Sequence, residues 1–387
     1  MEGVNGLEPY LETFDAESGY LNWASFGPLS PAVRAEAQAD ADLLGTGRRG
    51  GIDLVSSRVG EARGLLAALL DVADDEVTLQ PSTTYGLMQA LFGLTGELLL
   101  APHEFPSLTV TARRAADARG LLRVHDLPDG PVTADAVRGA LTEETTAIAV
   151  SLVDYRTGYL ADLSALRDVI GDRLLIVDAV QAFGVVEADW HAADVVCGNG
   201  YKWLRAGRGT GFAWFSARAR ERIDPVLSGV SGMDGDLSGI GVPAPVGTAA
   251  AYTVAPADPL ASARLATALR EIQAAGVAEI AAALRDRARD VMALADRYGV
   301  PVLTDRERHA GIVALAHEPA EAGHLAAALA NNGVTATARG GTIRLSPHIG
   351  TGADTFLLLG DALAEASAAR LSLQAASGGA DVVVSGS

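Results

Sequence analysis

The sequence contains one lysine, Lys202, although 30 of its 387 residues are basic. Arginine therefore supplies almost all of the positive charge. A guanidinium group stays protonated and is not nucleophilic, whereas a desolvated lysine amine can lose its proton and attack a carbonyl carbon. The single lysine therefore predicts a residue that forms a Schiff base, and the alternative is an ordinary surface charge.

The sequence also has only one cysteine, Cys197, and no long apolar run. One cysteine excludes an internal disulfide. The strongest apolar runs, Leu98–Leu100 and Leu174–Val177, fall far short of the roughly 20 residues that span a bilayer. The first residues lack the basic start and apolar stretch of a secretion signal. We therefore expect a cytoplasmic protein that does not insert into a membrane.

Basic residues are scarce relative to acidic ones, 30 against 48, which gives a net charge of -18. This excess argues against binding to a nucleic-acid backbone or to an anionic membrane. The seven histidines follow neither the His-Glu-x-x-His pattern nor the cysteine-paired pattern of zinc sites, so we expect no metal. An anionic ligand would need a locally built site.

The length suits two domains. We expect an N-terminal segment over residues 1–30, a large α/β domain over 31–255 that binds the ligand, and a smaller α+β domain over 256–374. The last residues, 375–387, have little apolar surface to bury and are expected to be disordered.

Strand-like and helix-like segments alternate through the large domain, which is typical of a mostly parallel sheet covered on both faces. Ligands bind beyond the carboxyl ends of the strands in such sheets. The expected strands are Glu76–Leu79, Leu98–Ala101, Arg123–His125, Ala147–Val153, Leu174–Val180, Asp194–Cys197 and Gly211–Phe215.

Several of these strands are followed by residues that can bind a ligand or take part in a reaction. Ser82–Gly86 follow the first strand and open a helix, and a helix N-terminus can bind phosphate. A phosphate anchor, a flat ring, an acid for a ring nitrogen and an amine for an aldehyde are the parts of a pyridoxal 5'-phosphate site. The corresponding residues after later strands are Phe105, Asp178, Gln181, Asn199, Tyr201 and Lys202.

Three runs, Val177–Gly184, Gly200–Leu204 and Arg208–Phe212, resemble the class V aminotransferase family of fold-type I pyridoxal-phosphate enzymes. The separation of acid and lysine, 202 - 178 = 24 residues, is also similar. The resemblance implies a mostly parallel central sheet, a smaller C-terminal α+β domain and a homodimer. Further matches extend over nearly the whole chain, at Asn22–Pro28, Ser82–Gly86, Glu104–Ser107, Ser151–Gly158 and Arg344–His348.

The resemblance also implies a role for each candidate residue. Lys202 would form the internal aldimine and shuttle the Cα proton, and Asp178 would pair with the pyridine nitrogen. Arg344, from the small domain, would clamp the carboxylate of a small amino-acid substrate. The other implied contacts are Phe105 stacked on the ring, Gln181 at the ring hydroxyl, Thr83, Thr84, Asn199 and Tyr201 at the phosphate, and, as additional cofactor and substrate contacts, Asp154 and Asn22.

The motifs leave the reaction open. Desulfurase relatives use a cysteine well after the lysine, whereas Cys197 precedes Lys202 in an expected buried strand, so a persulfide-forming desulfurase is not expected. Tyr155–Gly158 resembles the kynureninase branch, while Glu104–Ser107 and Lys202–Phe212 resemble the C–S lyase of ergothioneine biosynthesis. We favour Cβ–S elimination slightly, with class V transamination, kynureninase-like hydrolysis and, last, non-catalytic cofactor binding as alternatives.

Two segments depart from the family pattern. Ile349–Thr351 stands where relatives often have an aromatic–asparagine pair, and Ala255–Asp258 replaces an expected Gly-Thr-Pro. These departures affect substrate recognition and any phosphate contact from a neighbouring subunit. Arg205, close to Lys202, is an additional charge that is expected to favour an acidic substrate side chain.

Overall fold

The computed structural model describes residues 6–235, 241–316 and 319–378. The chain divides into two compact units. The large unit comprises Met1–Thr13, Phe26–Tyr155 and Leu160–Ala281, and the small unit comprises Phe14–Ser25, Arg156–Tyr159 and Ala282–Ser387. This division lies later in the chain than the boundary expected after residue 255.

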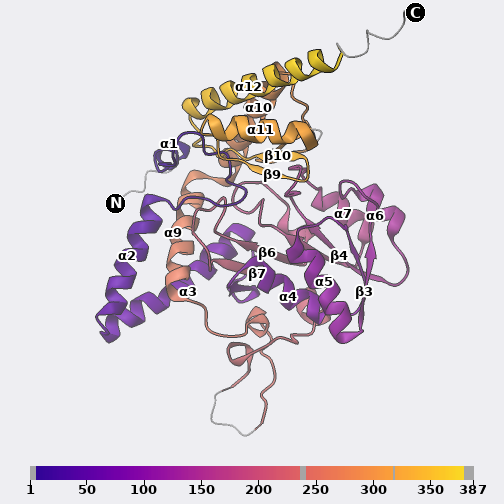
Figure 1. The fold of residues 1–387 in the computed structure, drawn as a ribbon. Helices are drawn as coiled ribbons and strands as arrows, with labels where there is room; N and C mark the ends of the chain where they lie inside the picture. Colours follow the sequence, from indigo (N-terminus) through magenta and orange to yellow (C-terminus); the bar gives the residue numbers. More distant parts are fainter. Residues whose placement is uncertain (1–5, 236–240, 317–318, 379–387) are drawn as a thin grey trace, which may run out of the picture. The chain divides into compact units, whose positions relative to one another are not determined.

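The large unit contains a seven-stranded sheet (Figure 1). Its strand order is β1-β7-β6-β5-β4-β2-β3. Strands β2 to β6 pair with one another in parallel. Strand β7 is antiparallel to both β1 and β6. The expected mostly parallel α/β sheet is confirmed. The strands are β1 (Val77–Gln80), β2 (Gly96–Leu100), β3 (Leu122–Asp126), β4 (Thr145–Ser151), β5 (Leu174–Asp178), β6 (Val195–Asn199) and β7 (Gly211–Phe215).

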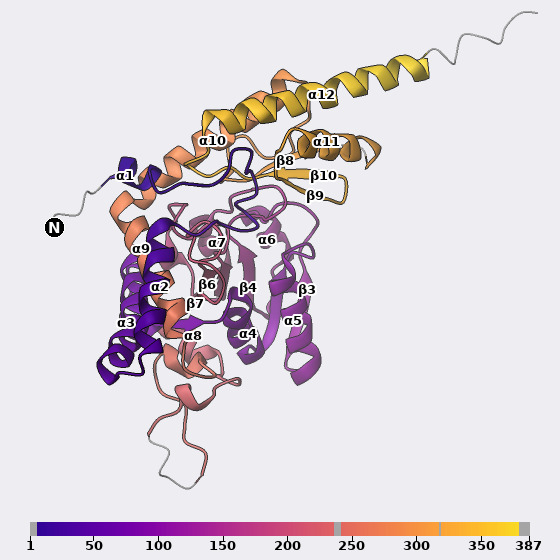
Figure 2. The same cartoon turned by 60° about the vertical axis from the view of Figure 1, so that its left-hand side comes forward.

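Nine α-helices lie wholly within the described part of the large unit. Three of them, α2, α3 and α9, pack side by side (Figure 2). Packing against α2 and α3 explains why α9 belongs to the large unit although it follows residue 255. The helices are α1 (Leu7–Leu11), α2 (Pro31–Gly45), α3 (Arg49–Leu70), α4 (Thr83–Gly93), α5 (Pro106–Arg119), α6 (Ala134–Ala140), α7 (Leu163–Ile170), α8 (Ala217–Arg222) and α9 (Pro259–Ala275).

The central strands are buried along their whole length. Every residue of β5, β6 and β7 is buried. Burial on both faces explains why these strands read as continuous apolar runs and not as an alternation of apolar and polar residues. The polar groups that end the strands, such as Asp178 and Asn199, therefore lie at the border of an apolar core.

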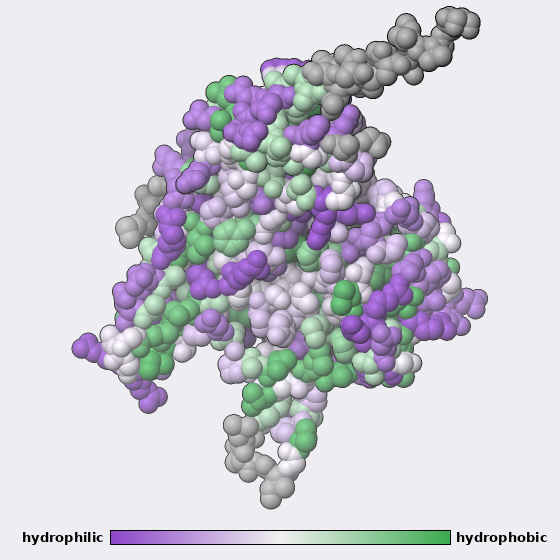
Figure 3. All heavy atoms as spheres, viewed as in Figure 1, coloured by the Kyte–Doolittle hydropathy of each residue, from purple (hydrophilic) through white to green (hydrophobic). Residues whose placement is uncertain are grey.

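The edge strand β3 carries charged residues. Arg123 forms an ion pair with Glu144, and Asp126 forms one with Arg113. Figure 3 shows hydrophilic side chains gathered over β3, α5 and α6. Charges along an unpaired strand edge hinder its pairing with a strand of another molecule.

The small unit contains an antiparallel sheet with the order β8-β10-β9. Its strands are β8 (Val313–Ala316), β9 (Thr337–Arg339) and β10 (Thr342–Leu345), and its helices include α10 (Val277–Arg297), α11 (Pro319–Asn331) and α12 (Ala353–Gly378). The first residues of α10 belong to the large unit. Buried residues such as Val291, Leu315, Leu325, Ile343 and Leu359 form one core.

The C-terminal segment differs in part from the expectation of disorder over residues 375–387. Helix α12 continues to Gly378, and residues 379–387 lie outside the described part of the chain. Alanine and leucine, which favour helix, occur frequently in its last turns and explain this extension. Within the described residues, no helix is both long enough and apolar enough to cross a membrane.

Asp194, directly before β6, fixes the start of the strand that leads to Lys202. Its buried carboxylate accepts hydrogen bonds from Arg167 Nη2 at 2.6 Å, Arg218 Nε at 2.7 Å and the backbone N–H of Leu175 at 2.8 Å. This carboxylate therefore links β5, β6, α7 and α8.

Substitution Asp194→Ala is expected to lower the free energy of unfolding by about 3 kcal/mol, because it leaves two guanidinium groups and a backbone N–H without their common acceptor. Chemical denaturation of the cofactor-free protein measures this change. Asp135→Ala, which breaks an exposed ion pair with Arg138, is the control and should change stability by less than about 0.5 kcal/mol. Equal effects of the two substitutions would contradict this role of Asp194.

Candidate active site

Lys202 lies in the turn that follows β6 and is 6% exposed. Its Nζ atom is 5.7 Å from the centroid of the Phe105 ring and 5.5 Å from the centroid of the Tyr201 ring. These two aromatic residues and the burial separate this lysine from the ordinary solvated surface lysine. The alternative of a chance surface charge is therefore wrong.

Asp178 ends β5, the strand that pairs with β6. Its buried carboxylate accepts a hydrogen bond from the backbone N–H of Val180 at 2.9 Å. Burial raises the pKa of Asp178 to about 6, although the Val180 hydrogen bond and the charge of Lys202 act in the opposite direction. A further cation beside this carboxyl would stabilise its charged form, and a protonated ring nitrogen is such a cation.

Gln181 connects the end of β5 to the lysine turn. Its Oε1 accepts a hydrogen bond from Trp203 Nε1 at 2.8 Å, and both side chains are buried. This contact orients the Gln181 amide so that its NH₂ end serves as the donor. The sequence alone indicates no role for Trp203, although its position directly after Lys202 is a signal for one.

Four predicted phosphate residues meet where α4 begins. Asn199 Nδ2 donates to Thr83 Oγ1 at 2.7 Å, and the backbone N–H of Tyr201 donates to Asn199 Oδ1 at 3.3 Å. The hydroxyl groups of Thr84 and Ser107 are 2.8 Å apart. The first N–H groups of a helix have no acceptor within the helix and favour an anion. The start of α4, with these polar residues, can therefore hold a phosphate group.

Glu104 is a second buried carboxyl in this region, and the sequence alone predicts no separate role for it. Its Oε1 accepts from the backbone N–H of Ser151 at 2.9 Å, and its Oε2 accepts from Ser151 Oγ at 2.5 Å. Ser151 pairs in register with Asp178 across β4 and β5. Burial raises the pKa of Glu104 to about 7; the Ser151 bonds lower it, and the charges of Asp178 and Asp154 raise it further.

Phe105, the predicted ring-stacking residue, packs edge-on against Tyr155. The two ring centroids are 5.1 Å apart with an interplanar angle of 83°. Tyr155 therefore extends the apolar wall beside Lys202, and the neighbouring Asp154 lies close enough for its charge to act on Glu104. The predicted cofactor residues of the large unit are thus brought together around one lysine.

The two predicted substrate residues, Arg344 and Asn22, are both in the small unit. Arg344 Nη2 donates to Ser25 Oγ at 2.7 Å. Thr337 Oγ1 donates to Asn22 Oδ1 at 2.8 Å and lies 3.2 Å from Ser25 Oγ. A network of hydroxyl and amide groups thus holds the guanidinium of Arg344.

Arg205 does not have the position that substrate binding requires. It is 1% exposed, and its guanidinium donates to Thr13 Oγ1, to the Thr13 carbonyl and to the Pro28 carbonyl. The expectation that Arg205 favours an acidic substrate side chain is therefore wrong, because this side chain is directed into the protein and bonded there.

Cys197 lies within β6 and is fully buried. Burial raises the pKa of its thiol well above the ordinary range, and the charge of Asp178 adds to the rise. A buried thiol that stays protonated is a poor nucleophile. This position does not suit a residue that accepts sulfur from a substrate.

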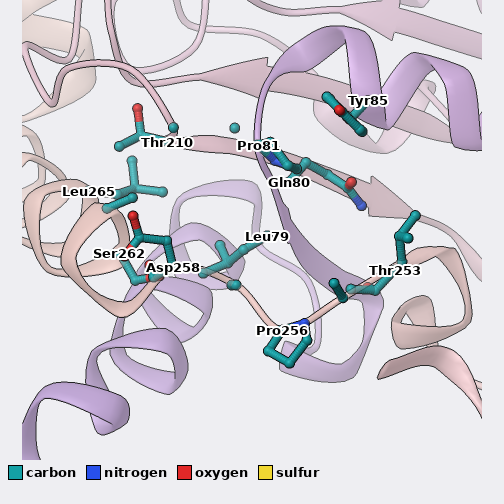
Figure 4. A pocket seen from close by; sticks show the side chains of 16 residues that line it. Leu79, Gln80, Pro81, Tyr85, Thr210, Thr253, Pro256, Asp258, Ser262 and Leu265 are labelled. Atoms are coloured by element: carbon teal, nitrogen blue, oxygen red, sulfur yellow. The ribbon is translucent and has the colours of Figure 1, made fainter. Parts of the chain in front are cut away.

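The segment that departs from the family's Gly-Thr-Pro, Ala255–Asp258, lines a cavity of about 470 Å³ (Figure 4). Pro81 and Tyr85, at the beginning of α4, line the same cavity together with Thr210. The segment Ala255–Asp258 is therefore close to the start of α4, where Thr83 and Thr84 lie.

The raised pKa of Glu104 predicts a pH dependence of stability. The folded protein retains the Glu104 proton between the ordinary carboxyl pKa of about 4.5 and its folded value of about 7, so the contribution of Glu104 to stability decreases as pH rises through this window. In the cofactor-free wild type this decrease in the free energy of unfolding should be at most roughly 3 kcal/mol. In cofactor-free Glu104→Gln it should be absent. Urea unfolding at pH 5 to 8 measures the difference. Parallel curves for the two proteins would contradict this prediction.

Residues 35–382 match the family described as aminotransferase class-V. The chain is 28% identical over 255 residues to kynureninase from Pseudomonas fluorescens and 29% identical over 246 residues to kynureninase from Burkholderia mallei (strain SAVP1). These alignments cover 59% and 58% of this chain, respectively, and the same shares of the two enzymes. The chain thus spans less than two thirds of the curated relatives it matches.

The structure is also similar to solved structures along nearly the whole chain. A cysteine desulfurase from Thermococcus onnurineus NA1 has a TM-score of 0.83 at 17% identity, covering 95% of this chain and 100% of that one. The cystine C–S lyase C-DES, in complex with cysteine persulfide, has a TM-score of 0.80 at 21% identity, covering 90% and 98%. The family match over residues 35–382 shows that the chain belongs to the class V aminotransferase family of pyridoxal-phosphate-dependent enzymes.

Proposed function

We propose that this protein binds pyridoxal 5'-phosphate at Lys202 and cleaves a bond at Cβ of an amino acid, with elimination of a sulfur-bearing side chain as the reaction. The main support is a buried, solitary lysine whose charge acts on a buried carboxyl at the end of the neighbouring strand. A desolvated amine with a partner carboxylate is what attachment of an aldehyde cofactor requires.

The residues around Lys202 fit this cofactor. The start of α4 with Thr83, Thr84, Asn199 and Tyr201 would hold the phosphate, and the buried Asp178 would hold a protonated ring nitrogen. Phe105 would cover one face of the ring, and the donor end of Gln181 suits the ring hydroxyl. When bound, pyridoxal phosphate supplies an aldehyde for amines and a ring that withdraws electrons from Cα.

Lys202 is the residue that would move the proton. Its Nζ would accept the proton from the substrate Cα, and the carboxylate of Asp178 would keep the ring nitrogen charged. In an elimination, the Cα–H and Cβ–S bonds break, the sulfur leaves as a thiolate and takes up a proton, and water releases a 2-oxo acid and ammonia. Arg344 would bind the substrate carboxylate through its planar guanidinium, which Ser25 holds.

Elimination agrees better with the single cysteine than protein-bound sulfur transfer does. Cys197 is buried within β6, and its thiol stays protonated. Sulfur removed from a substrate would therefore leave with the product. The fold neighbour C-DES, which carries the name of a cystine C–S lyase, provides a precedent for this chemistry on a similar fold.

A kynureninase-type hydrolase is the second candidate. The curated relatives are kynureninases at 28–29% identity, and the segment Tyr155–Gly158 resembles that branch. Both candidates act at Cβ and use the same lysine, so the choice between them depends on the leaving group. Transamination needs the same residues but also a 2-oxo acid acceptor.

The reaction is tested by incubating the cofactor-loaded protein with cysteine S-conjugates and, in parallel, with kynurenine. We expect a thiol, pyruvate and ammonia from the conjugates without an added 2-oxo acid. Product that forms only when a 2-oxo acid acceptor is present would favour transamination and contradict elimination. Cleavage of kynurenine alone would favour the hydrolase.

Substitution Lys202→Arg keeps the positive charge but removes the nucleophilic amine, so turnover should fall by roughly 10³-fold or more. Steady-state product formation measures the loss. A Lys202→Arg enzyme with full activity would contradict the assignment of the lysine, and circular dichroism of the variant serves as the folding control.

Substitution Cys197→Ala should leave the rate of elimination within about twofold of the wild type and cost about 1 kcal/mol of stability, because it removes only a buried, inert sulfur atom. Product assays and denaturation measure both quantities. If the variant folds but releases no sulfur product, Cys197 takes part in the reaction and the elimination proposal is wrong.

A further inference from the structure

Arg205 has a backbone conformation that is unusual for its residue type. Its φ angle is 62°, in the left-handed region that disfavours residues with a side chain. Glycine or asparagine adopts this conformation more readily. An arginine at this position therefore suggests that the guanidinium group provides something that a residue better suited to the turn lacks.

The guanidinium of Arg205 binds two places in the N-terminal part of the large unit. Nη1 donates to Thr13 Oγ1 at 2.7 Å, Nη2 donates to the Thr13 carbonyl at 2.5 Å, and Nε donates to the Pro28 carbonyl at 3.2 Å. Hydrogen bonds from a buried charged group are stronger than those between neutral groups. The Arg205 side chain thus joins both Thr13 and Pro28 to the lysine turn.

The backbone of the same turn contacts Lys202 directly. The N–H of Arg205 donates to the Lys202 carbonyl at 3.0 Å, and the N–H of Gly27 donates to the Tyr201 carbonyl at 2.9 Å. A Cβ atom on Gly27 would lie 1.9 Å from the Lys202 carbonyl oxygen. The N-terminal segment therefore lies against the Lys202 backbone without room for any side chain between them.

A partly buried acid, Glu271, supports the charge of Arg205. Burial raises the pKa of Glu271 in α9, and the charge of Arg205 opposes this rise together with a hydrogen bond from Ser30. Ser30 Oγ is 3.0 Å from Glu271 Oε1 and also caps α2 by accepting from the N–H of Val33. The N-terminal segment is therefore anchored to both the lysine turn and α9.

We propose that Arg205 is a positioning residue that fixes the Lys202 turn against the N-terminal segment, so that the lysine amine is presented to the cofactor. The proposal rests on the proposed function only for its consequence in cofactor binding. The clamp itself, formed by Arg205, Thr13 and Pro28, belongs to the protein without a cofactor.

Hydrogen–deuterium exchange of the cofactor-free protein tests the clamp. Arg205→Asn suits the left-handed backbone but lacks the guanidinium, so exchange should rise about tenfold in peptides covering Thr13–Pro28 and the Lys202 turn. Arg205→Lys, with a single donor group, should give a smaller rise. Arg34→Ala is the control, because this exposed arginine donates to the carbonyl of Leu29, next to Pro28, without being part of the clamp, and exchange there should match the wild type.

The consequence for the cofactor is measured by absorbance titration with pyridoxal phosphate. Arg205→Asn should raise the dissociation constant about tenfold, while the KM for the amino acid stays within about twofold of the wild type. Wild-type exchange in both peptides of Arg205→Asn overturns the proposal, and so does a change confined to the KM for acidic substrates.

Two further outcomes are decisive. If Arg205→Asn does not fold, Arg205→Lys decides: unchanged exchange in that variant overturns the proposal, and increased exchange supports it. If the wild-type protein binds no pyridoxal phosphate, the proposed function fails, whereas the exchange results still decide whether Arg205 holds the turn.

Discussion

The withdrawal of two opposite charges from water is the constraint on which this structure depends. Asp178 ends β5, and Lys202 follows the end of the neighbouring strand β6. All residues of both strands are buried. Burial of charge is costly unless each group has partners. The backbone N–H of Val180 and the charge of Lys202 are such partners for Asp178 at the end of β5. They make a reactive lysine compatible with an apolar core.

The topology converts this constraint into a site. Parallel strands β4, β5 and β6 end at the same edge of the sheet, so Ser151 pairs with Asp178, and Asn199 follows two residues after Cys197, the partner of Asp178 on β6. The antiparallel strand β7 returns the chain from the lysine turn to the sheet. The turn itself is fixed from its other side by Arg205 and Gly27. Rigid elements therefore surround the one side chain that must react.

The sequence predicted much of this because the relevant signals are local. Apolar runs located the strands, and β7 has the same bounds, Gly211–Phe215, as expected. The motif around Lys202 and the acid at the end of β5 pointed to two residues that are buried in the structure and whose charges interact. The Glu104–Ser151 contact could not be predicted in this way, since it depends on the adjacency of β2 and β4. The role of Arg205 depends on one backbone angle, and sequence spacing gives position but not direction.

The most direct test is to reduce the protein with borohydride after loading with pyridoxal phosphate and to map its tryptic peptides by mass spectrometry. Lys202 is the only lysine, and trypsin does not cleave after a modified lysine, so the chain offers one unambiguous position. We expect an uncut peptide Leu174–Arg205 that carries the mass of the reduced cofactor. Unmodified peptides Leu174–Lys202 and Trp203–Arg205, from a protein that stays colourless with pyridoxal phosphate, would contradict it.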